Sequence, residues 1–148
     1  MKRPWNRVDE QVYSLYTDKN EPNMNICTYV TPISLKPKAI LIAIYKGTYT
    51  YDNLSKRCLL QYLTSSQAKY VRKLGYKKGP GKLKNLPIKE YKGLKYIEGC
   101  NAIVELELLS KSKGLDHDLF LFKVLSYKNL ADEVGLTTNI LRNKKIIS

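Results

Sequence analysis

The hydrophobic positions of the chain fall into short runs separated by turn residues. Residues 39–45 form an unbroken apolar run that is rich in β-branched residues and too short for a globular helix, so it predicts a strand buried on both faces. Apolar and charged residues alternate over 102–109, which predicts a strand that presents Glu105 and Glu107 to solvent. After a turn, residues 117–125 are its expected partner strand.

Shorter patterns fill the rest of the chain. They predict strands over 11–17, 25–34 and 59–64 and short helices over 52–57 and 67–74, the second ending at Gly75. Residues 76–95 are expected to form a mobile loop excursion, and residues 129–148 a short helix with a basic tail that we leave unassigned. Many short strands with few helices predict one domain over 1–148, mainly β and built as an antiparallel barrel.

Length and composition narrow the class of protein. The 148 residues can bury a core without disulfides, and no apolar run approaches the roughly 20 residues of a membrane helix. No apolar stretch follows the basic N-terminus, so we expect no signal peptide and a cytoplasmic location. Cys27, Cys58 and Cys100 are widely spaced and the chain has one histidine, so we expect buried thiols and no metal site.

The formal net charge of +13 leaves several classes of partner open. Nucleic acid, anionic cofactors and a compositional bias such as lysine enrichment at high growth temperature would each explain it. Ten of the 26 basic residues lie between Lys69 and Lys95, beside a single acid, Glu90. Because the lysines gather there and do not alternate with the 12 tyrosines on strands, a nucleic-acid partner is disfavoured.

A basic, hydroxyl-rich turn follows the apolar strand. Lys46-Gly47-Thr48-Tyr49-Thr50 stands just before a short helical pattern. Unpaired N–H groups at a helix start, together with nearby hydroxyls and a cation, are suited to a phosphate. The alternative for this segment alone is an ordinary surface turn.

Three separated segments resemble one known family. Tyr29-Val30-Thr31-Pro32-Ile33-Ser34 is followed after two residues by Pro37, the apolar strand and the threonine-rich turn. Residues 96–102 and 116–120, Asp-His-Asp-Leu-Phe, follow in order and at fitting spacing. Together they span about residues 10 to 130 and resemble the flavin reductase-like family, whose members are FMN-binding split β-barrels.

The resemblance implies an antiparallel Greek-key split β-barrel with short helical excursions that binds FMN. It implies reduction of flavin, or of ferric iron, by NAD(P)H, in a homodimer that serves free flavin or a partner oxygenase as acceptor. The residues it places at the phosphate are Lys46, Thr48, Tyr49, Thr50 and Asn53. The residues it places along the isoalloxazine ring are Cys27, Thr28, Tyr29, Val30 and Thr31.

Two further expectations concern the nicotinamide. The family's matching histidine lies near the flavin, so His117 is expected to orient NAD(P)H without acting as a general acid. No G-x-G-x-x-G motif follows a strand, so NAD(P)H would bind transiently over the flavin. The basic stretch, through Lys77, Lys78 and Lys82, is a candidate lid for its phosphates.

The chain departs from the family pattern at four positions. Tyr29 replaces a tryptophan but keeps a planar wall, whereas Ile26 removes a hydroxyl. Leu115 and Phe122 replace glycines and are expected to reshape the ring pocket. FMN binding is therefore better supported than reductase activity. The alternatives are a non-catalytic FMN carrier, a basic OB-like barrel for single-stranded nucleic acid, and a pyridoxamine-phosphate-oxidase-like barrel, which lacks the T-P-x-S signature.

Overall fold

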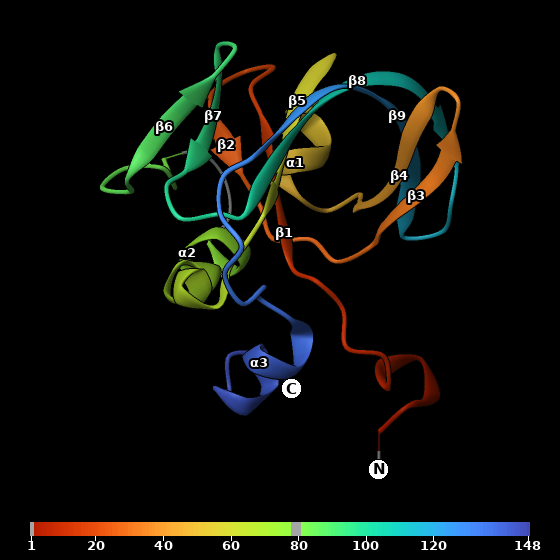
Figure 1. Cartoon of the computed structure of the whole chain (residues 1–148). Helices are drawn as coiled ribbons and strands as arrows, with labels where there is room; N and C mark the ends of the chain where they lie inside the picture. Colours follow the sequence, from red (N-terminus) through yellow and green to blue (C-terminus); the bar gives the residue numbers. More distant parts are fainter. Residues whose placement is uncertain (1, 78–80) are drawn as a thin grey trace.

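A computed structural model describes residues 2–77 and 81–148, so Lys78 lies outside the described residues. Within them, seven antiparallel strands form one strongly curved sheet in the order β2-β1-β5-β8-β9-β4-β3, and β6 and β7 form a separate hairpin (Figure 1). Sheet neighbours that are not consecutive in sequence, such as β4 and β9, give the barrel its Greek-key crossovers. The predicted antiparallel β-barrel is confirmed.

The main sheet contains β1 (Tyr13–Thr17), β2 (Asn23–Met24), β3 (Val30–Leu35), β4 (Lys38–Tyr45), β5 (Arg57–Tyr62), β8 (Ala102–Ser112) and β9 (His117–Asn129). The hairpin contains β6 (Ile88–Tyr91) and β7 (Leu94–Ile97). The helices are α1 (Tyr49–Asp52), α2 (Val71–Tyr76) and α3 (Thr138–Asn143), with 3₁₀ turns η1 (Pro4–Asn6) and η2 (Ser65–Tyr70).

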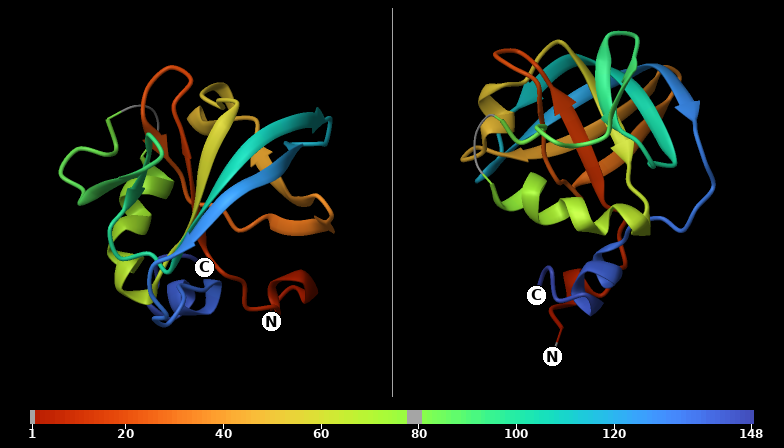
Figure 2. Two further views of the ribbon diagram at one scale, coloured as in Figure 1. Left: turned by 45° about the horizontal axis from the view of Figure 1, so that its top comes forward. Right: turned by 90° about the vertical axis from the view of Figure 1, so that its left-hand side faces the viewer.

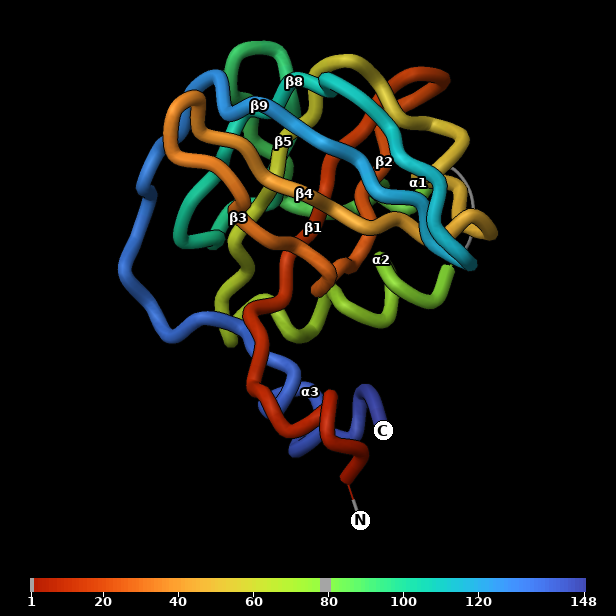
Figure 3. Tube along the Cα trace, turned by 90° about the vertical axis from the view of Figure 1, so that its right-hand side faces the viewer, coloured from red at the N-terminus to blue at the C-terminus, as the bar shows by residue number. Residues whose placement is uncertain are grey.

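The strand β4 lies between β3 and β9, as the tube in Figure 3 shows. Ile40, Ile42 and Ile44 point into the barrel core, whereas Leu41 and Ala43 on the other face are only half-buried. In the single chain, therefore, only the core face of this strand is fully buried. A strand of an antiparallel barrel has one face on the core and one face outside, and the apolar run conceals that difference.

Local capping places the first helices earlier than the sequence predicts. The Thr48 hydroxyl accepts a hydrogen bond from the Tyr51 N–H, so α1 begins at Tyr49, and β5 begins at Arg57, where a helix was expected. A capping box between Thr64 and Gln67 starts η2, which leads directly into α2. Gly75 lies inside α2 and does not end it.

The excursion expected over 76–95 contains ordered structure. Lys92 and Gly93 both have positive φ angles, which suits the tight turn between β6 and β7. Leu94 and Ile97 are buried, and the Tyr91 hydroxyl is hydrogen-bonded to Ser126 of β9 at 2.9 Å. The prediction of a mobile loop is wrong for this hairpin. A Lys-Gly pair is typical of the turn between two strands, but within a basic run it has the composition expected of a loop.

Glu105 is buried, contrary to the expectation of a surface glutamate. It is 5% exposed, and its carboxylate accepts hydrogen bonds from Arg57 at 2.6 Å and from Ser126 at 2.7 Å. Burial raises its pKa, but the bond from Ser126 and the charges of Arg57 and Lys92 together hold that pKa below its ordinary value. Side chains on both neighbouring strands cover this position, which the alternating pattern of β8 does not reveal.

The two ends of the chain pack together beside the barrel (Figures 1 and 2). Asp9 accepts a hydrogen bond from the Asn139 N–H at 2.9 Å, and the Glu10 N–H donates to the Thr138 hydroxyl at 3.1 Å. The expected short helix of the tail is α3, and it packs on the N-terminal segment. None of the helices within 2–77 and 81–148 is long and apolar enough to cross a membrane.

Candidate functional site

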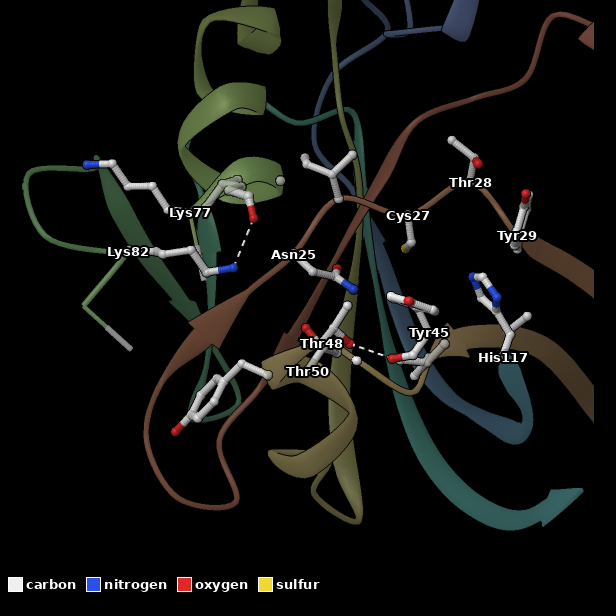
Figure 4. A pocket seen from close by; sticks show the side chains of 17 residues that line it. Asn25, Cys27, Thr28, Tyr29, Tyr45, Thr48, Thr50, Lys77, Lys82 and His117 are labelled. Atoms are coloured by element: carbon white, nitrogen blue, oxygen red, sulfur yellow. Dashed lines mark hydrogen bonds between the residues drawn. The ribbon is translucent and has the colours of Figure 1, made fainter. Parts of the chain in front are cut away.

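A hollow of about 350 Å³ opens between four segments of the chain (Figure 4). Residues 25–29 connect β2 to β3 and form one wall, and residues 43–45 and 47–50, at and after the end of β4, form another. The end of α2 and the first residue of β9, His117, complete it. The topology thus gathers three sequence segments that the resemblance singled out.

One end of the hollow is aromatic. The ring of His117 lies 5.2 Å from that of Tyr29 and 5.4 Å from that of Tyr45, measured between centroids. Tyr29 and Tyr45 are 60% and 49% exposed, so this end is open to solvent. Nδ1 of His117 lies 2.8 Å from a carboxylate oxygen of Asp116, and in the neutral imidazole this bond leaves Nε2 as an acceptor.

Cys27 forms the wall next to the aromatic end. Its N–H and C=O both bond the backbone of Tyr13 at 2.9 Å, which fixes its position. Cys27 is half-buried, unlike Cys58 and Cys100, which are fully buried as expected. Desolvation raises the pKa of the Cys27 thiol to about 12, so the thiol is neutral at physiological pH and forms a wall without nucleophilic character.

The opposite end of the hollow is polar and cationic (Figure 4). Thr48 and Thr50 line it from α1, Asn25 lines it from the β2–β3 connection, and Lys77 and Lys82 line it from the segment after α2. The Thr48 hydroxyl donates to the carbonyl of Tyr45 at 2.8 Å as well as capping α1. Lys82 is only 7% exposed, which is unusual for a lysine.

Four of the sequence-predicted ligands lie outside this hollow. Val30 and Thr31 pair with Ile42 and Leu41 in the β3–β4 ladder and are absent from its lining. The ammonium of Lys46 lies 3.5 Å from Asp118, and Asn53 is fully buried. The Asn53 amide donates to Thr17 and Glu21 and accepts from the N–H groups of Asn20 and Glu21. The assignment of Asn53 as a phosphate ligand therefore conflicts with its hydrogen bonds.

Tyr45, Asn25 and Lys82 are lining residues that were not among the expected flavin ligands. Tyr45 is the last residue of the apolar run. The basic turn that begins next to it, at Lys46, is the feature of the sequence that suggests a site near Tyr45. Lys82 was considered only for the nicotinamide phosphates. Nothing in the basic stretch distinguishes a buried lysine from its exposed neighbours.

Asp118 anchors the start of β9 behind His117. It accepts hydrogen bonds from the Tyr51 hydroxyl at 2.6 Å and from the Gly114 N–H at 3.0 Å, with Lys46 close by. These bonds, with the charge of Lys46, lower the pKa of Asp118 to about 2. A Cβ on Gly114 would clash with the carbonyl oxygen of His117, so the turn requires glycine.

We expect this carboxylate to make stability acid-sensitive. Its folded-state pKa lies below its ordinary value of 3.8, so its contribution is fully present above about pH 4 and is lost as the pH falls toward 2. Asp118→Asn should therefore give a flatter profile of urea midpoint between pH 5 and pH 2.5 than the wild type. Parallel profiles for the two proteins would show that Asp118 titrates alike in the folded and unfolded states.

Comparison with known proteins identifies the family of this chain. The family model described as a flavin reductase like domain matches residues 5–141. The chain belongs to the flavin reductase-like family. A sequence comparison with curated proteins finds no match.

Solved structures similar to this flavin reductase-like chain include three flavin-related proteins. NADH:FAD oxidoreductase SgcE6 of Streptomyces globisporus C-1027 has a TM-score of 0.84 at 20% identity, covering 91% of this chain and 84% of its own. Nitrilotriacetate monooxygenase component B from Mycobacterium thermoresistibile has a TM-score of 0.83 at 18% identity, covering 91% of this chain and 78% of its own. An FMN-binding protein from Thermus thermophilus has a TM-score of 0.77 at 22% identity, covering 87% of this chain and 77% of its own. These likenesses confirm the predicted split β-barrel.

Two departures from the flavin reductase-like pattern lie away from the hollow. Leu115 is 93% exposed in the turn before β9. Phe122 is fully buried inside the barrel among Ile40, Ile42 and Leu106. The expectation that these two side chains reshape the ring pocket is wrong, because neither lines it. Ile26, the third departure, does line it.

Proposed function

We propose that the chain binds FMN in this hollow and catalyses reduction of flavin by NAD(P)H. The observation that supports FMN is the polarity of the hollow, which is aromatic at one end and cationic at the other. FMN has the same division into a planar ring system and a phosphate. The segment at 27–29 and the threonines of the 46–50 turn therefore serve the ring and the phosphate, respectively.

When bound, FMN supplies the two-electron redox chemistry. The protein's part is to hold and orient the reactants. Backbone groups of Thr28 and Tyr29 would hydrogen-bond the polar edge of the ring, and the neutral thiol of Cys27 would provide an apolar wall. His117, fixed by Asp116, orients the nicotinamide at the open aromatic end. Tyr29 and Tyr45 leave that end accessible, so NAD(P)H can enter and leave as a substrate.

We also propose that the protein works as a cytoplasmic homodimer. β3 is an edge strand, and its Ile33 and Leu35 are 51% and 79% exposed. A second copy covering this edge would bury those side chains. Free flavin, ferric iron or a partner oxygenase is the electron acceptor, and the name of the similar monooxygenase component B favours an oxygenase.

An absorbance spectrum of the purified protein tests the main proposal. When FMN is added to the protein, the absorbance bands of the flavin should shift and sharpen relative to those of free FMN. Anaerobic addition of NADH or NADPH should then bleach these flavin bands. The bleaching rate, compared with that of free FMN at the same concentrations, measures the contribution of the protein. A faster reaction with one of the two nucleotides would also identify the electron donor.

The other outcomes separate the alternatives. Flavin bands that persist after addition of either nucleotide would indicate a non-catalytic FMN carrier. A protein that leaves the FMN spectrum unchanged would contradict the proposal. Salt-dependent retention of that protein on single-stranded DNA would then favour the nucleic-acid alternative.

A further inference from the structure

A buried carboxylate follows His117 at the start of β9. Asp118 is 4% exposed, and its two oxygens accept from different donors, the Tyr51 hydroxyl at 2.6 Å and the Gly114 N–H at 3.0 Å. These bonds, with the nearby charge of Lys46, lower its pKa to about 2, so the carboxylate is ionised at physiological pH and is purely an acceptor. Because consecutive side chains of a strand point to opposite faces, Asp118 lies away from the hollow that His117 lines.

The bond to Gly114 fixes the backbone of His117. It closes the turn before β9, in which a Cβ on Gly114 would clash with the His117 carbonyl oxygen. Tyr45 of β4 pairs with His117, and the next residue, Lys46, donates its N–H to the carbonyl of Asp116 at 3.0 Å. The buried carboxylate is therefore part of the frame that holds the imidazole.

The bond to Tyr51 connects the same carboxylate to α1. The Tyr51 ring packs edge-on against Phe120, with 5.7 Å between the centroids. The Lys111 ammonium donates to the Tyr51 hydroxyl at 3.4 Å, and that hydroxyl directs its own proton to the carboxylate. Thr48 caps α1 and Thr50 belongs to it, and both line the polar end of the hollow (Figure 4). One carboxylate thus joins the helix at the polar end to the strand that carries the histidine.

We propose that Asp118 is a positioning residue that fixes His117 relative to the threonines of α1 and thereby sets how NAD(P)H meets the flavin. This inference rests on the proposed function, because it assumes that a flavin and a nicotinamide meet in the hollow. A carboxylate serves both donors at once, whereas an amide has one acceptor oxygen and turns its NH₂ group toward one of the donors. Hydride transfer depends steeply on the relative position of the reactants, and a displacement of about 1 Å can cost about a hundredfold in rate.

The test separates the rate of hydride transfer from flavin binding. Wild type and Asp118→Asn are loaded with FMN, and anaerobic reduction of the bound flavin is followed at increasing NADH or NADPH concentration. The maximal rate should fall by about tenfold to a hundredfold in the variant, as expected for a misplaced reactant. The Kd for FMN, measured by quenching of flavin fluorescence, should stay within about twofold, because Asp118 does not line the hollow. Tyr51→Phe keeps the ring on Phe120 and removes only the bond to α1, so it should show the same separation with a smaller loss of rate.

A second measurement needs no flavin. His117 is the single histidine of the chain, so its imidazole gives one set of NMR signals. In the wild type the neutral ring should be held as one tautomer, with the proton on Nδ1 facing Asp116, and the ring signals should shift in Asp118→Asn and in Tyr51→Phe. Asp132→Asn is the matched control, because it neutralises an exposed aspartate. Its reduction rate and its His117 signals should equal those of the wild type.

The remaining outcomes decide against one proposal or the other. A wild-type reduction rate with unchanged His117 signals in Asp118→Asn would overturn the inference. A loss of FMN affinity as large as the loss of rate would also overturn it, since it would reflect a distorted hollow. A wild-type protein that binds no FMN, or whose bound FMN is not reduced, would instead contradict the proposed function, and the His117 signals would still report whether Asp118 positions the ring.

Discussion

Phe122→Ala is expected to lower the free energy of unfolding by about 3–5 kcal/mol, the usual cost of truncating a fully buried phenylalanine. Phe122 is 0% exposed and lies on β9 between Ile40 of β4 and Leu108 of β8. All three strands are paired over long stretches, so the surrounding backbone cannot close over the cavity. The loss should appear as a lower urea midpoint with an unchanged slope.

The same variant tests where Phe122 acts. Because its side chain does not line the hollow, the FMN affinity of the folded Phe122→Ala protein should match that of the wild type. Leu115→Ala is the control, since Leu115 is 93% exposed and its truncation should change stability by at most about 0.5 kcal/mol. A clear loss of FMN affinity in Phe122→Ala without a loss of stability would place this residue at the flavin after all.

The strands that the sequence predicts well are those with a long and consistent pattern. The runs at 39–45, 102–109 and 117–125 correspond to β4, β8 and β9. Each predicted strand lies within the observed bounds and begins within one residue of the observed start. The errors occur where the local pattern is short. Side-chain caps by Thr48 and Thr64 determine the helices at 49–52 and 65–76, and a Lys-Gly turn determines the β6–β7 hairpin.

The lining of the hollow was predictable where it coincides with a contiguous motif. Residues 27–29, 48–50 and His117 meet in one hollow although 19 to 90 positions separate them. The burial of Lys82 was not predictable, because it depends on how the segment after α2 returns toward that helix. Lys46 and Asn53 have the right chemistry for a phosphate, but Asp118 and residues 17–21 engage them.

Asn53→Ala is expected to lower the free energy of unfolding by about 2–4 kcal/mol, because truncation leaves two backbone donors without an acceptor. Oδ1 of Asn53 accepts from the N–H groups of Asn20 and Glu21 at 2.7 and 3.3 Å. Its NH₂ group donates to the carbonyl of Thr17 at 3.2 Å and to that of Glu21 at 2.8 Å. One buried amide therefore organises the turn between β1 and β2 against the end of α1.

Asn53→Asp separates the two halves of this amide. The carboxylate keeps the acceptor but places a second oxygen against the carbonyls of Thr17 and Glu21, so we expect a stability loss similar to that of alanine. Asn129→Ala, at an exposed position on β9, should change the urea midpoint little. FMN affinity of the folded Asn53→Ala protein should equal that of the wild type, because the amide faces the β1–β2 turn. A weaker FMN affinity at unchanged stability would show that Asn53 contacts the phosphate, as the sequence alone suggested.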